Sequence, residues 1–430
     1  MPQSGSNLFL VLDIGTSYIK CGCVDSENNI LALYQQVFPM QKRGSFFEID
    51  FDLFLNSTQK LLKECLTDPE VKDYKLEALL ITSQAQTFVP VNVDFQALRK
   101  GIVWLDDRAE KEADYLGKLL PDYGETSGFV RPLPEQYVSK LLWLKRNEPS
   151  VFGKAYAFPL INEYLVQKLT GRFYSDITGF GMSGMFNFRS NSINKEILSI
   201  LGLTEAFFPE IGKPGVRGEL ISKPIQQEWD LPNEFPVYLC GFDQGVSAYG
   251  SGVRKTGDVN INLGTAMVLY TITESLATNL SENQIAGKHS VGDDYFLLNL
   301  ENDFGIQIRQ LKENYFKNDA YDLLFQTYLD YPDELEKIPP FDSTVLNFAK
   351  PEDAHKLCAG IIKYYINRLK IHFAQIRKSV ELKNIFISGG MAQSEVWLKI
   401  LGEALNYPFT INNRSNAGIF GAIDIYHYNQ

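Results

Sequence analysis

The sequence LFLVLDIGTSYIK, residues 8–20, decides how the rest of the chain is interpreted. Its apolar start, LFLVL, is typical of a buried strand, and Asp13 follows that strand directly. Residues 15–17, Gly-Thr-Ser, then form a short polar turn. Backbone N–H groups at such a turn can approach phosphate oxygens, hydroxyls add donors, and an aspartate can hold hydrated Mg²⁺. The same residues also suit an ordinary turn, so this stretch alone leaves a phosphate role and a structural role open.

Length and charge narrow the class of protein. At 430 residues the chain is longer than one hydrophobic core usually supports, so two domains are expected. Hydrophobic residues make up 45% of the chain and charged residues 22%, the balance of a globular protein in water. The net charge of −11 argues against general binding of nucleic acid. Any anion site must therefore be built locally, from loops and helix ends.

The N-terminus and the cysteines predict a cytoplasmic protein. The opening residues, MPQSGSN, contain no basic stretch followed by an apolar one, so no signal peptide is expected. No apolar stretch approaches the roughly 20 residues of a membrane span, so no membrane contact is expected either. The five cysteines are scattered, which favours reduced thiols over a disulfide framework. The four histidines have no zinc-binding spacing.

Polar residues repeatedly follow apolar strands in the first half of the chain. LEALLITSQ at 76–84 and GIVWLDDR at 101–108 both have the composition of buried strands. The polar or aromatic side chains at their ends are Ser83, Gln84, Gln86, Trp104, Asp106, Asp107 and Arg108. In open α/β sheets, ligands bind just beyond the strand ends. Together with the end of the opening strand, these strand ends predict a ligand site.

Other segments are expected to complete and cover the sheet. Residues 18–25 and 30–37 continue the opening strand as an antiparallel meander, and a helix starts at Asp52. Helical spacing or length predicts further helices at 108–120, 134–147, 160–169 and 351–380, and residues 179–188 are expected to form a packed loop. Prolines and glycines are frequent between 208 and 236, so the crossover between domains is expected there.

The second half repeats the form of the first. INLGTAMVLYTI at 261–272 has the same order of strand, Gly-Thr turn and strand as VLDIGTSYIKCGCV at 11–24. Such self-similarity indicates two copies of one unit, whose two phosphate-gripping hairpins could face a cleft between domains. Near the end, NIFISGG at 384–390 is typical of a strand followed by a helix start. Its Gly-Gly pair lets a ring or a phosphate approach the backbone, although a tight turn alone would also need glycine.

Six motifs in order resemble the FGGY carbohydrate kinases, within the actin-like ATPase superfamily. They are D-I-G-T-S-x-x-K at Asp13–Lys20, I-V-W-L-D-D-R at Ile102–Arg108, K-L-L-W-L-K-R-N-E-P at Lys140–Pro149, G-F-D-Q at Gly241–Gln244, L-G-T-A at Leu263–Ala266 and I-S-G-G-M-A-x-S at Ile387–Ser394. The resemblance implies an α/β fold of two ribonuclease-H-like domains, each a mixed central sheet flanked by helices, with an interdomain cleft. It divides the chain into an N-terminal domain, 1–235, and a C-terminal domain, 236–430.

The resemblance also implies a kinase that uses ATP and Mg²⁺, and it assigns roles to residues. Asp243 matches the general base that accepts the proton of the substrate hydroxyl, and Asp13 matches the carboxylate that helps to hold Mg²⁺. The residues expected to bind the nucleotide are Gly15, Thr16, Ser17 and Lys20 in the first half and Gly264, Thr265, Gly389, Gly390 and Ser394 in the second. Phosphoryl transfer needs these parts, because it depends on positioning and on neutralising the charge of the γ-phosphate.

The residues expected to contact the substrate are Gln84, Gln86, Trp104, Asp106 and Gln244. Family members usually have Met-His here, or Arg-Glu in the glycerol kinases, whereas this chain has Ala85 and Gln86. The missing Arg-Glu pair argues against glycerol, and the motif at 140–149 is more similar to xylulokinases and gluconokinases. A small sugar, first of all a ketose of the xylulose type, is therefore the expected substrate.

Three alternatives stay open at this point. Gluconate or a polyol could replace the ketose, because specificity depends on loop shapes that a sequence does not display. A catalytically weak, regulatory sugar- or nucleotide-binding relative is the other class, supported by a short and less family-like stretch at 271–350. The usual Glu-Gly-Ile is also replaced by Ala359-Gly360-Ile361. A homodimer is an option that the sequence leaves open.

Overall fold

The chain forms two compact units, of which the first is built from three separate segments. The computed structural model describes residues 7–231, 233–316, 321–331, 351–412, 414 and 416–430. Unit 1 comprises Met1–Gly250, Ser275–Phe296 and Asn416–Gln430, and unit 2 comprises Ser251–Glu274 and Leu297–Ser415. The predicted division at residue 235 stays a prediction about domain organisation, whereas the compact units follow this interleaved partition.

A mixed six-stranded sheet forms the centre of unit 1, in the order β12-β13-β6-β1-β2-β3. These strands are β1 (Asn7–Ile14), β2 (Tyr18–Asp25), β3 (Ile30–Val37), β6 (Lys75–Ser83), β12 (Gly218–Leu220) and β13 (Pro236–Phe242). The strands β1, β6 and β13 run parallel to one another, whereas β2 and β3 are antiparallel, as the predicted meander requires. The carboxyl ends of β1, β6 and β13 therefore meet at one edge.

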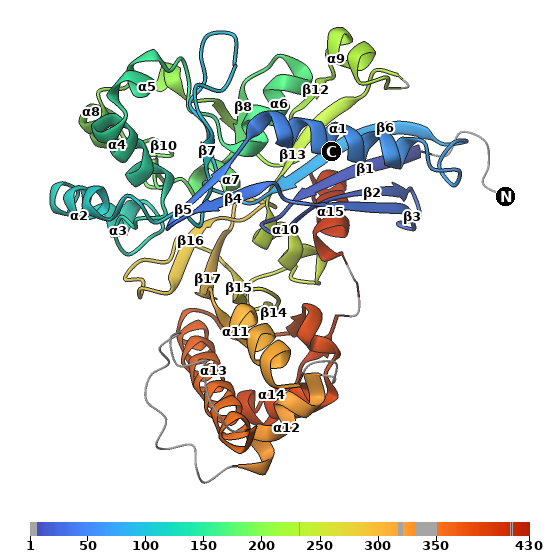
Figure 1. The fold of residues 1–430 in the computed structure, drawn as a ribbon, viewed down its shortest axis with the longest axis vertical. Coiled ribbons are helices and arrows are strands. Elements are labelled where there is room, and N and C mark those ends of the chain that lie inside the picture. The colour runs from blue at the N-terminus through green and yellow to red at the C-terminus, as the bar shows by residue number, and fades with distance from the viewer. Residues whose placement is uncertain (1–6, 232, 317–320, 332–350, 413, 415) are drawn as a thin grey trace. The chain divides into compact units, whose positions relative to one another are not determined.

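Strand β1 is buried on both faces, which explains its continuous apolar sequence. Its alternate side chains Leu8, Leu10 and Leu12 join one core cluster together with helix α1 (Phe51–Leu66). Phe9 and Val11 join another cluster, with helix α15 (Ala417–Asn429). Figure 1 shows α1 and α15 on opposite sides of this sheet. Helix α1 starts where the sequence predicts it, because the Asp50 side chain accepts hydrogen bonds from the first-turn N–H groups.

Shorter elements surround this sheet. A small sheet in the order β4-β5-β7 consists of β4 (Met40–Arg43), β5 (Phe46–Ile49) and β7 (Gly101–Ile102). Other elements of unit 1 are α2 (Glu110–Leu119), α3 (Tyr123–Thr126), α4 (Tyr137–Asn147), α5 (Pro149–Lys154), α6 (Ile161–Thr170), β8 (Tyr174–Asp176), α7 (Ile177–Gly181), β9 (Phe186–Asn187), β10 (Ser192–Ile193), α8 (Lys195–Leu201), the 3₁₀ turn Glu205–Phe207, β11 (Glu210–Gly212), α9 (Lys223–Glu228), α10 (Asp243–Gly250) and β16 (Gln284–Lys288). The helices predicted at 108–120, 134–147 and 160–169 thus form, shifted by up to three residues.

Two local predictions were wrong. Only Gly101 and Ile102 of the expected strand 101–108 are extended, because the chain turns at Val103, whose carbonyl accepts the Asp106 N–H at 3.1 Å. Part of the expected loop at 179–188 is helical instead. The Asp176 carboxylate accepts hydrogen bonds from the N–H groups of Thr178 and Gly179, so it starts the short helix α7.

Unit 2 contains a second mixed sheet, whose strands follow the order β17-β15-β14-β18-β19. They are β14 (Val259–Leu263), β15 (Met267–Thr273), β17 (Tyr295–Glu301), β18 (Ile385–Ser388) and β19 (Thr410–Ile411). The helices are α11 (Phe304–Leu311), continued by the π-helical turn Lys312–Phe316, and α12 (Tyr321–Asp330), α13 (Pro351–Ser379) and α14 (Glu395–Leu405), with the 3₁₀ turn Gly390–Gln393 before α14. Apolar side chains of β14, α13 and α14 form one core.

The internal repeat predicted from the sequence is visible in the strand pairing. In unit 1, β1 forms an antiparallel hairpin with β2 and lies parallel to β6. In unit 2, β14 forms an antiparallel hairpin with β15 and lies parallel to β18. Each unit is therefore a mixed sheet flanked by helices, as expected. Within the part of the chain that the structure describes, no helix is long and apolar enough to cross a membrane.

Candidate active site

Two carboxylates lie at the carboxyl edge of the sheet in unit 1. Asp13 is near the end of β1, and Asp243 directly follows β13 as the first residue of α10. Burial and, to a smaller extent, the charge of Asp13 together raise the pKa of Asp243 to about 7. A hydrogen bond that Asp243 Oδ1 accepts from the Gln244 N–H at 2.8 Å opposes this rise. Asp243 thus titrates near neutral pH, where a general base works best.

Asp13 lies between Lys20, its partner in the β1–β2 hairpin, and the first turn of α15. It pairs with Lys20 across the β1–β2 hairpin, and the Lys20 charge partly offsets the rise that burial causes in the pKa of Asp13. A Cβ atom on Gly418 would lie only 2.8 Å from Asp13 Oδ2. Glycine therefore lets the first turn of α15 approach the carboxylate. The sequence motifs missed Gly418, which only the return of the last helix to unit 1 brings to the site.

Side chains from other segments of unit 1 donate hydrogen bonds to the turn between β1 and β2. Thr16 Oγ1 accepts a hydrogen bond from Trp104 Nε1 at 2.9 Å, and the Gly15 carbonyl accepts one from Gln84 Nε2 at 3.2 Å. The Gly15 N–H donates to the Tyr18 carbonyl at 3.0 Å, while Ser17 is exposed. Two side chains predicted to contact the substrate thus fix the predicted phosphate loop.

Thr87, which the sequence motifs do not include, connects the Gln84 side chain with the backbone of Trp104. Its hydroxyl donates to Gln84 Oε1 at 3.1 Å and accepts from the Trp104 N–H at 3.1 Å. Gln84 is almost fully buried and uses its side chain between Gly15 and Thr87. Contact of Gln84 and Trp104 with a substrate stays a prediction, but their support of the loop is a feature of the fold.

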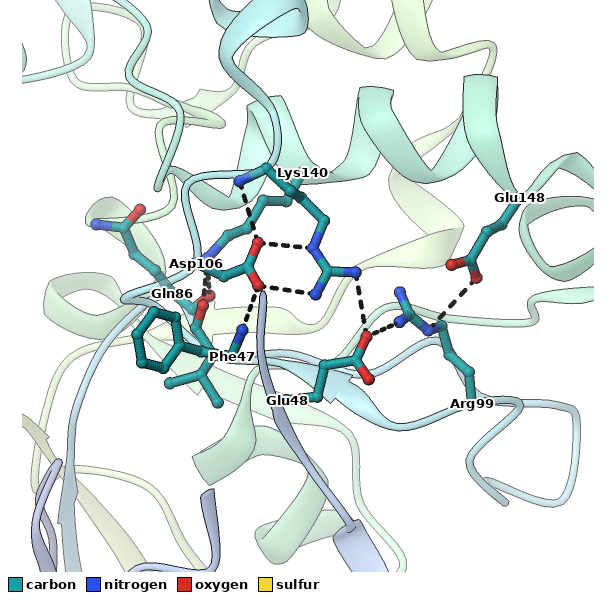
Figure 2. A network of polar contacts seen from close by, with 9 residues as sticks. Phe47, Glu48, Gln86, Arg99, Asp106, Lys140 and Glu148 are labelled. Atoms are coloured by element: carbon teal, nitrogen blue, oxygen red, sulfur yellow. Dashed lines mark hydrogen bonds and ion pairs between the residues drawn. The ribbon is translucent and has the colours of Figure 1, made fainter. Parts of the chain in front are cut away.

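Asp106 is completely buried within a network of charges (Figure 2). Its Oδ1 accepts from Arg108 Nε at 2.6 Å, and its Oδ2 accepts from a terminal nitrogen of Arg108 at 2.7 Å and from the Phe47 N–H at 2.6 Å. Arg108 also pairs with Glu48, which binds Arg99 in turn. Asp106 therefore stabilises the small sheet through β5. Its contact with the substrate stays a prediction. Neither Phe47 nor Glu48 was predicted.

Gln86 has an unusual backbone conformation. Its φ of 63° lies in the left-handed region, which residues other than glycine rarely adopt. Its Oε1 accepts a hydrogen bond from the Tyr137 N–H at 3.2 Å, and its carbonyl accepts one from Lys140 Nζ at 3.3 Å. Gln244, the remaining predicted substrate residue, is half-buried in the first turn of α10, next to Asp243.

In unit 2, the second glycine loop packs tightly against other backbone. Gly264 and Thr265 form the turn between β14 and β15, and the Gly305 N–H donates to the Thr265 carbonyl at 2.9 Å. A Cβ atom on Gly305 would lie 2.0 Å from the Gly264 carbonyl oxygen, and one on Gly389 would lie 2.6 Å from the Leu263 carbonyl oxygen. The structure thus brings Gly264, Thr265 and Gly389 together within unit 2.

The last two nucleotide residues predicted from the Gly-Gly motif, Gly390 and Ser394, differ in exposure and in hydrogen bonding. Gly390 is exposed, and a Cβ atom there would meet nothing within 4 Å. Ser394 is buried and caps α14, since its hydroxyl accepts the Trp397 N–H at 3.1 Å and donates to Asp322. A nucleotide role of Ser394 stays a prediction beside this structural one.

The donors around Asp13 suit Mg²⁺ better than a permanently bound transition metal. Among the described residues, no group of three or more His, Cys, Asp or Glu side chains could hold a metal ion. Mg²⁺ keeps several waters and commonly binds through one or two carboxylates together with substrate phosphates. Asp13, beside a loop of backbone and hydroxyl donors, fits that pattern.

A separate cavity of about 780 Å³ lies elsewhere in unit 1. It is lined by residues such as Phe186, Lys213, Lys288 and Tyr295. None of the predicted site residues lines it. We therefore place the candidate active site at the carboxyl edge of the sheet, on the geometry of Asp13 and Asp243.

Comparison with known families identifies the family of this chain. The model of the N-terminal domain of the FGGY family of carbohydrate kinases matches residues 8–250, and that of the C-terminal domain matches residues 338–425. The chain belongs to the FGGY family of carbohydrate kinases. This FGGY chain is accordingly a phosphotransferase with a sugar hydroxyl as acceptor, which confirms the predicted enzyme class.

Individual relatives of this FGGY chain have low sequence identity to it. A xylulose kinase of Staphylococcus epidermidis is 24% identical over 421 residues, which cover 92% of this chain and 83% of the relative. Two solved structures from Lactobacillus acidophilus, of a ligand-bound xylulose kinase and of a gluconate kinase, each have a TM-score of 0.87. They are 18% and 19% identical and cover 98% and 99% of this chain and 89% of their own. These similarities confirm the predicted fold.

Proposed function

We propose that this chain transfers the γ-phosphoryl group of Mg²⁺-ATP to a hydroxyl of a ketose of the D-xylulose type. The observation that carries the proposal is the pair of carboxylates at one sheet edge, with the pKa of Asp243 raised to about 7. The name of the Staphylococcus epidermidis relative, a xylulose kinase that aligns with 92% of this chain, supports the choice of ketose.

In the proposed reaction, Asp243 accepts the proton of the attacking sugar hydroxyl while that oxygen bonds to the γ-phosphorus and ADP leaves. The turn at Gly15, Thr16 and Ser17 meets the phosphate oxygens, with the N–H and hydroxyl groups of Thr16 and Ser17 as donors, because the Gly15 N–H already donates to the Tyr18 carbonyl. Lys20 adds positive charge. Asp13 would hold Mg²⁺, which neutralises charge on the transferred phosphoryl group. The protein contributes mainly position and charge, because the transition state requires little covalent help.

Unit 2 contributes nucleotide binding in this proposal. Gly264 and Thr265 offer a second loop of donors, and Gly389 and Gly390 expose backbone that a phosphate or a flat ring can approach. Gln86, Trp104, Asp106, Gln84 and Gln244 are proposed to define the sugar site. We also propose that the enzyme works in the cytoplasm, since its five cysteines are free and buried. A homodimer is a further proposal, which sedimentation would test.

The test is ADP release with Mg²⁺-ATP and a panel of D-xylulose, L-xylulose, D-ribulose, D-gluconate, xylitol and glycerol. We expect the highest kcat/KM with D-xylulose. A higher value with D-gluconate or xylitol would replace the ketose but keep the kinase. Binding of ATP without turnover on any sugar would instead favour the regulatory, catalytically weak relative.

The base is tested separately with Asp243→Asn. This substitution keeps the size of the side chain and removes the proton acceptor, so kcat should fall by about 100- to 10,000-fold. Equilibrium binding of ATP should stay within about threefold, because Asp243 is proposed to meet the sugar rather than the nucleotide. An Asn variant with wild-type kcat would remove Asp243 from the role of base.

A further inference from the structure

Lys140 is a completely buried lysine that the proposed chemistry does not use. It lies on α4, and its exposed fraction is 0%. Its Nζ donates hydrogen bonds to the carbonyl oxygens of Val103, at 3.0 Å, and Gln86, at 3.3 Å (Figure 2). These two carbonyls belong to different segments of the chain, so a single side chain holds both.

The first of these segments needs such a restraint. Gln86 has φ 63°, a conformation that costs a non-glycine residue roughly 1 kcal/mol or more. Helix α4 donates two hydrogen bonds to Gln86, one from the Tyr137 N–H to its side chain and one from Lys140 Nζ to its carbonyl. The conformation decides where the Gln86 side chain points.

The second segment is the turn that follows β7. The Val103 carbonyl accepts from both the Lys140 side chain and the Asp106 N–H, which lies 3.1 Å away. Trp104 lies inside this turn, and its peptide nitrogen is bonded directly to the Val103 carbonyl carbon. Lys140 therefore borders three predicted sugar contacts, Gln86, Trp104 and Asp106.

A buried lysine at position 140 carries a desolvation cost that an apolar side chain would not have. Burial lowers the pKa of Lys140 to about 7, although the charges of Asp106 and Glu135 favour its protonated form. An apolar side chain of similar volume at a buried charged position is often neutral or stabilising. The hydrogen bonds that Lys140 donates thus suggest a purpose beyond stability.

We propose that Lys140 is a positioning residue for the sugar, which holds Gln86 and the turn Val103–Asp106 in the arrangement that meets the substrate. The inference rests on the proposed function, because it takes these residues as sugar contacts. Lys140 itself touches no substrate. Its effect should be larger on sugar affinity than on ATP affinity, since it has no hydrogen bond to Asp13 or to the turn at residues 15–17 and reaches that turn only through Trp104.

The decisive variant is Lys140→Met, whose unbranched side chain is one heavy atom shorter and has no donor. Lys145→Met is the matched control, because Lys145 lies on the same helix and also donates to a carbonyl, that of Ile200 at 3.0 Å. Titration calorimetry of the full chain with D-xylulose, and separately with ATP, gives the two dissociation constants. Thermal unfolding of each variant reports its stability.

We expect the dissociation constant of D-xylulose to rise at least tenfold in Lys140→Met, and that of ATP to rise by less than about fivefold, the loss expected from the single Trp104–Thr16 hydrogen bond. Lys145→Met should leave both unchanged. Wild-type sugar affinity in a folded Lys140→Met variant would overturn the proposal, whatever its melting temperature. Equal losses of sugar and ATP affinity would also overturn it, because they would indicate a general structural role.

A second variant covers the case in which Lys140→Met does not fold. Lys140→Gln keeps an N–H donor one bond closer to the backbone, so its sugar dissociation constant should rise at least threefold, and by more than that of ATP. No change for either ligand would overturn the inference. If the wild-type protein binds none of the panel sugars, the proposed function fails first and this inference fails with it. If wild type binds a sugar and both Lys140 variants bind it equally well, only this inference fails.

Discussion

Asp243, the proposed base, directly follows β13 at the carboxyl edge of the sheet and has a pKa raised to about 7. Its pKa of about 7 predicts a pH dependence. The carboxylate must be ionised to accept a proton, so kcat/KM for the sugar should fall about tenfold for each pH unit below the pKa. Initial rates between pH 5 and 9 test this. A flat profile below pH 7 would show that Asp243 is not the group that limits the rate.

The same shift predicts an effect on stability. The pKa of Asp243 in the folded protein lies above its ordinary value of 3.8, so the folded state binds more protons between these two values. Its stabilising contribution is therefore present at low pH and is lost as the pH rises through about 7. Asp243→Asn lacks this loss, so the variant should gain melting temperature relative to wild type from pH 5 to pH 8. An equal difference at both pH values would contradict the shifted pKa.

Trp104 offers a test of the connection between the sugar side and the phosphate loop. Trp104→Phe removes the Nε1 donor to Thr16 and keeps an aromatic ring. Loss of one such hydrogen bond is worth about 1 kcal/mol, so kcat/KM for ATP should fall by roughly fivefold. Trp229→Phe, at the buried residue that directly follows α9, controls for loss of an indole elsewhere in unit 1. Steady-state kinetics with varied ATP measure this effect. An unchanged kcat/KM for ATP in Trp104→Phe would show that the Trp104–Thr16 hydrogen bond does not affect the use of ATP.

At the scale of elements, the two helices that begin near the carboxylates pack through glycine. A Cβ atom on Gly421 of α15 would lie 2.0 Å from the Val246 carbonyl oxygen of α10, and one on Gly250 would lie 2.0 Å from that of Ala417. The helices can therefore approach until their backbones touch. Since α10 begins with Asp243 and α15 approaches Asp13 at Gly418, this packing also fixes the distance between the carboxylates.

Gly421→Ala should consequently lower both stability and activity. The added methyl group forces the helices apart, which typically costs about 1–3 kcal/mol in an interior. Gly153→Ala is the matched control, because Gly153 lies in helix α5 and a Cβ atom there would meet nothing within 4 Å. That control should be neutral or slightly stabilising. Chemical unfolding and kcat measure the two effects, and a Gly421→Ala variant as stable as wild type would refute the close packing.

The sequence predicts elements well where the pattern is local. The apolar run before Asp13 and the repeated Gly-Thr hairpin predicted the central hairpins β1–β2 and β14–β15, whereas β12, β17 and β19 were not predicted. Lys140, Glu48 and Gly418 could not be assigned in this way, since each acts on a residue far away in the chain. The end of strand 101–108 was misjudged for the same reason, because a lysine from another segment stabilises the turn that replaces it.

At the scale of the whole molecule, the chain returns to its first unit at the end. Residues 416–430 form α15, and Ile419, Ala422, Ile423 and Ile425 complete a core cluster with β1 and β6. Deletion of residues 416–430 should therefore leave the protein insoluble or unfolded, since it removes fully buried apolar side chains. Circular dichroism and solubility measure this outcome, with Tyr428→Ala as a control at an exposed position. A soluble, cooperatively folded deletion variant would contradict the assignment of α15 to unit 1.

The return of α15 has a consequence for the order of events during synthesis. The ribosome makes the strands of the first sheet early, but it makes the helix that covers their second face only after all of unit 2. Until then Phe9 and Val11 lack their partners on α15, and Asp13 lacks the glycine turn beside it. A nascent chain thus carries the proposed phosphate loop before the packing around Asp13 is complete. Phosphoryl transfer is therefore expected only after α15 has been made and has packed against β1 and β6.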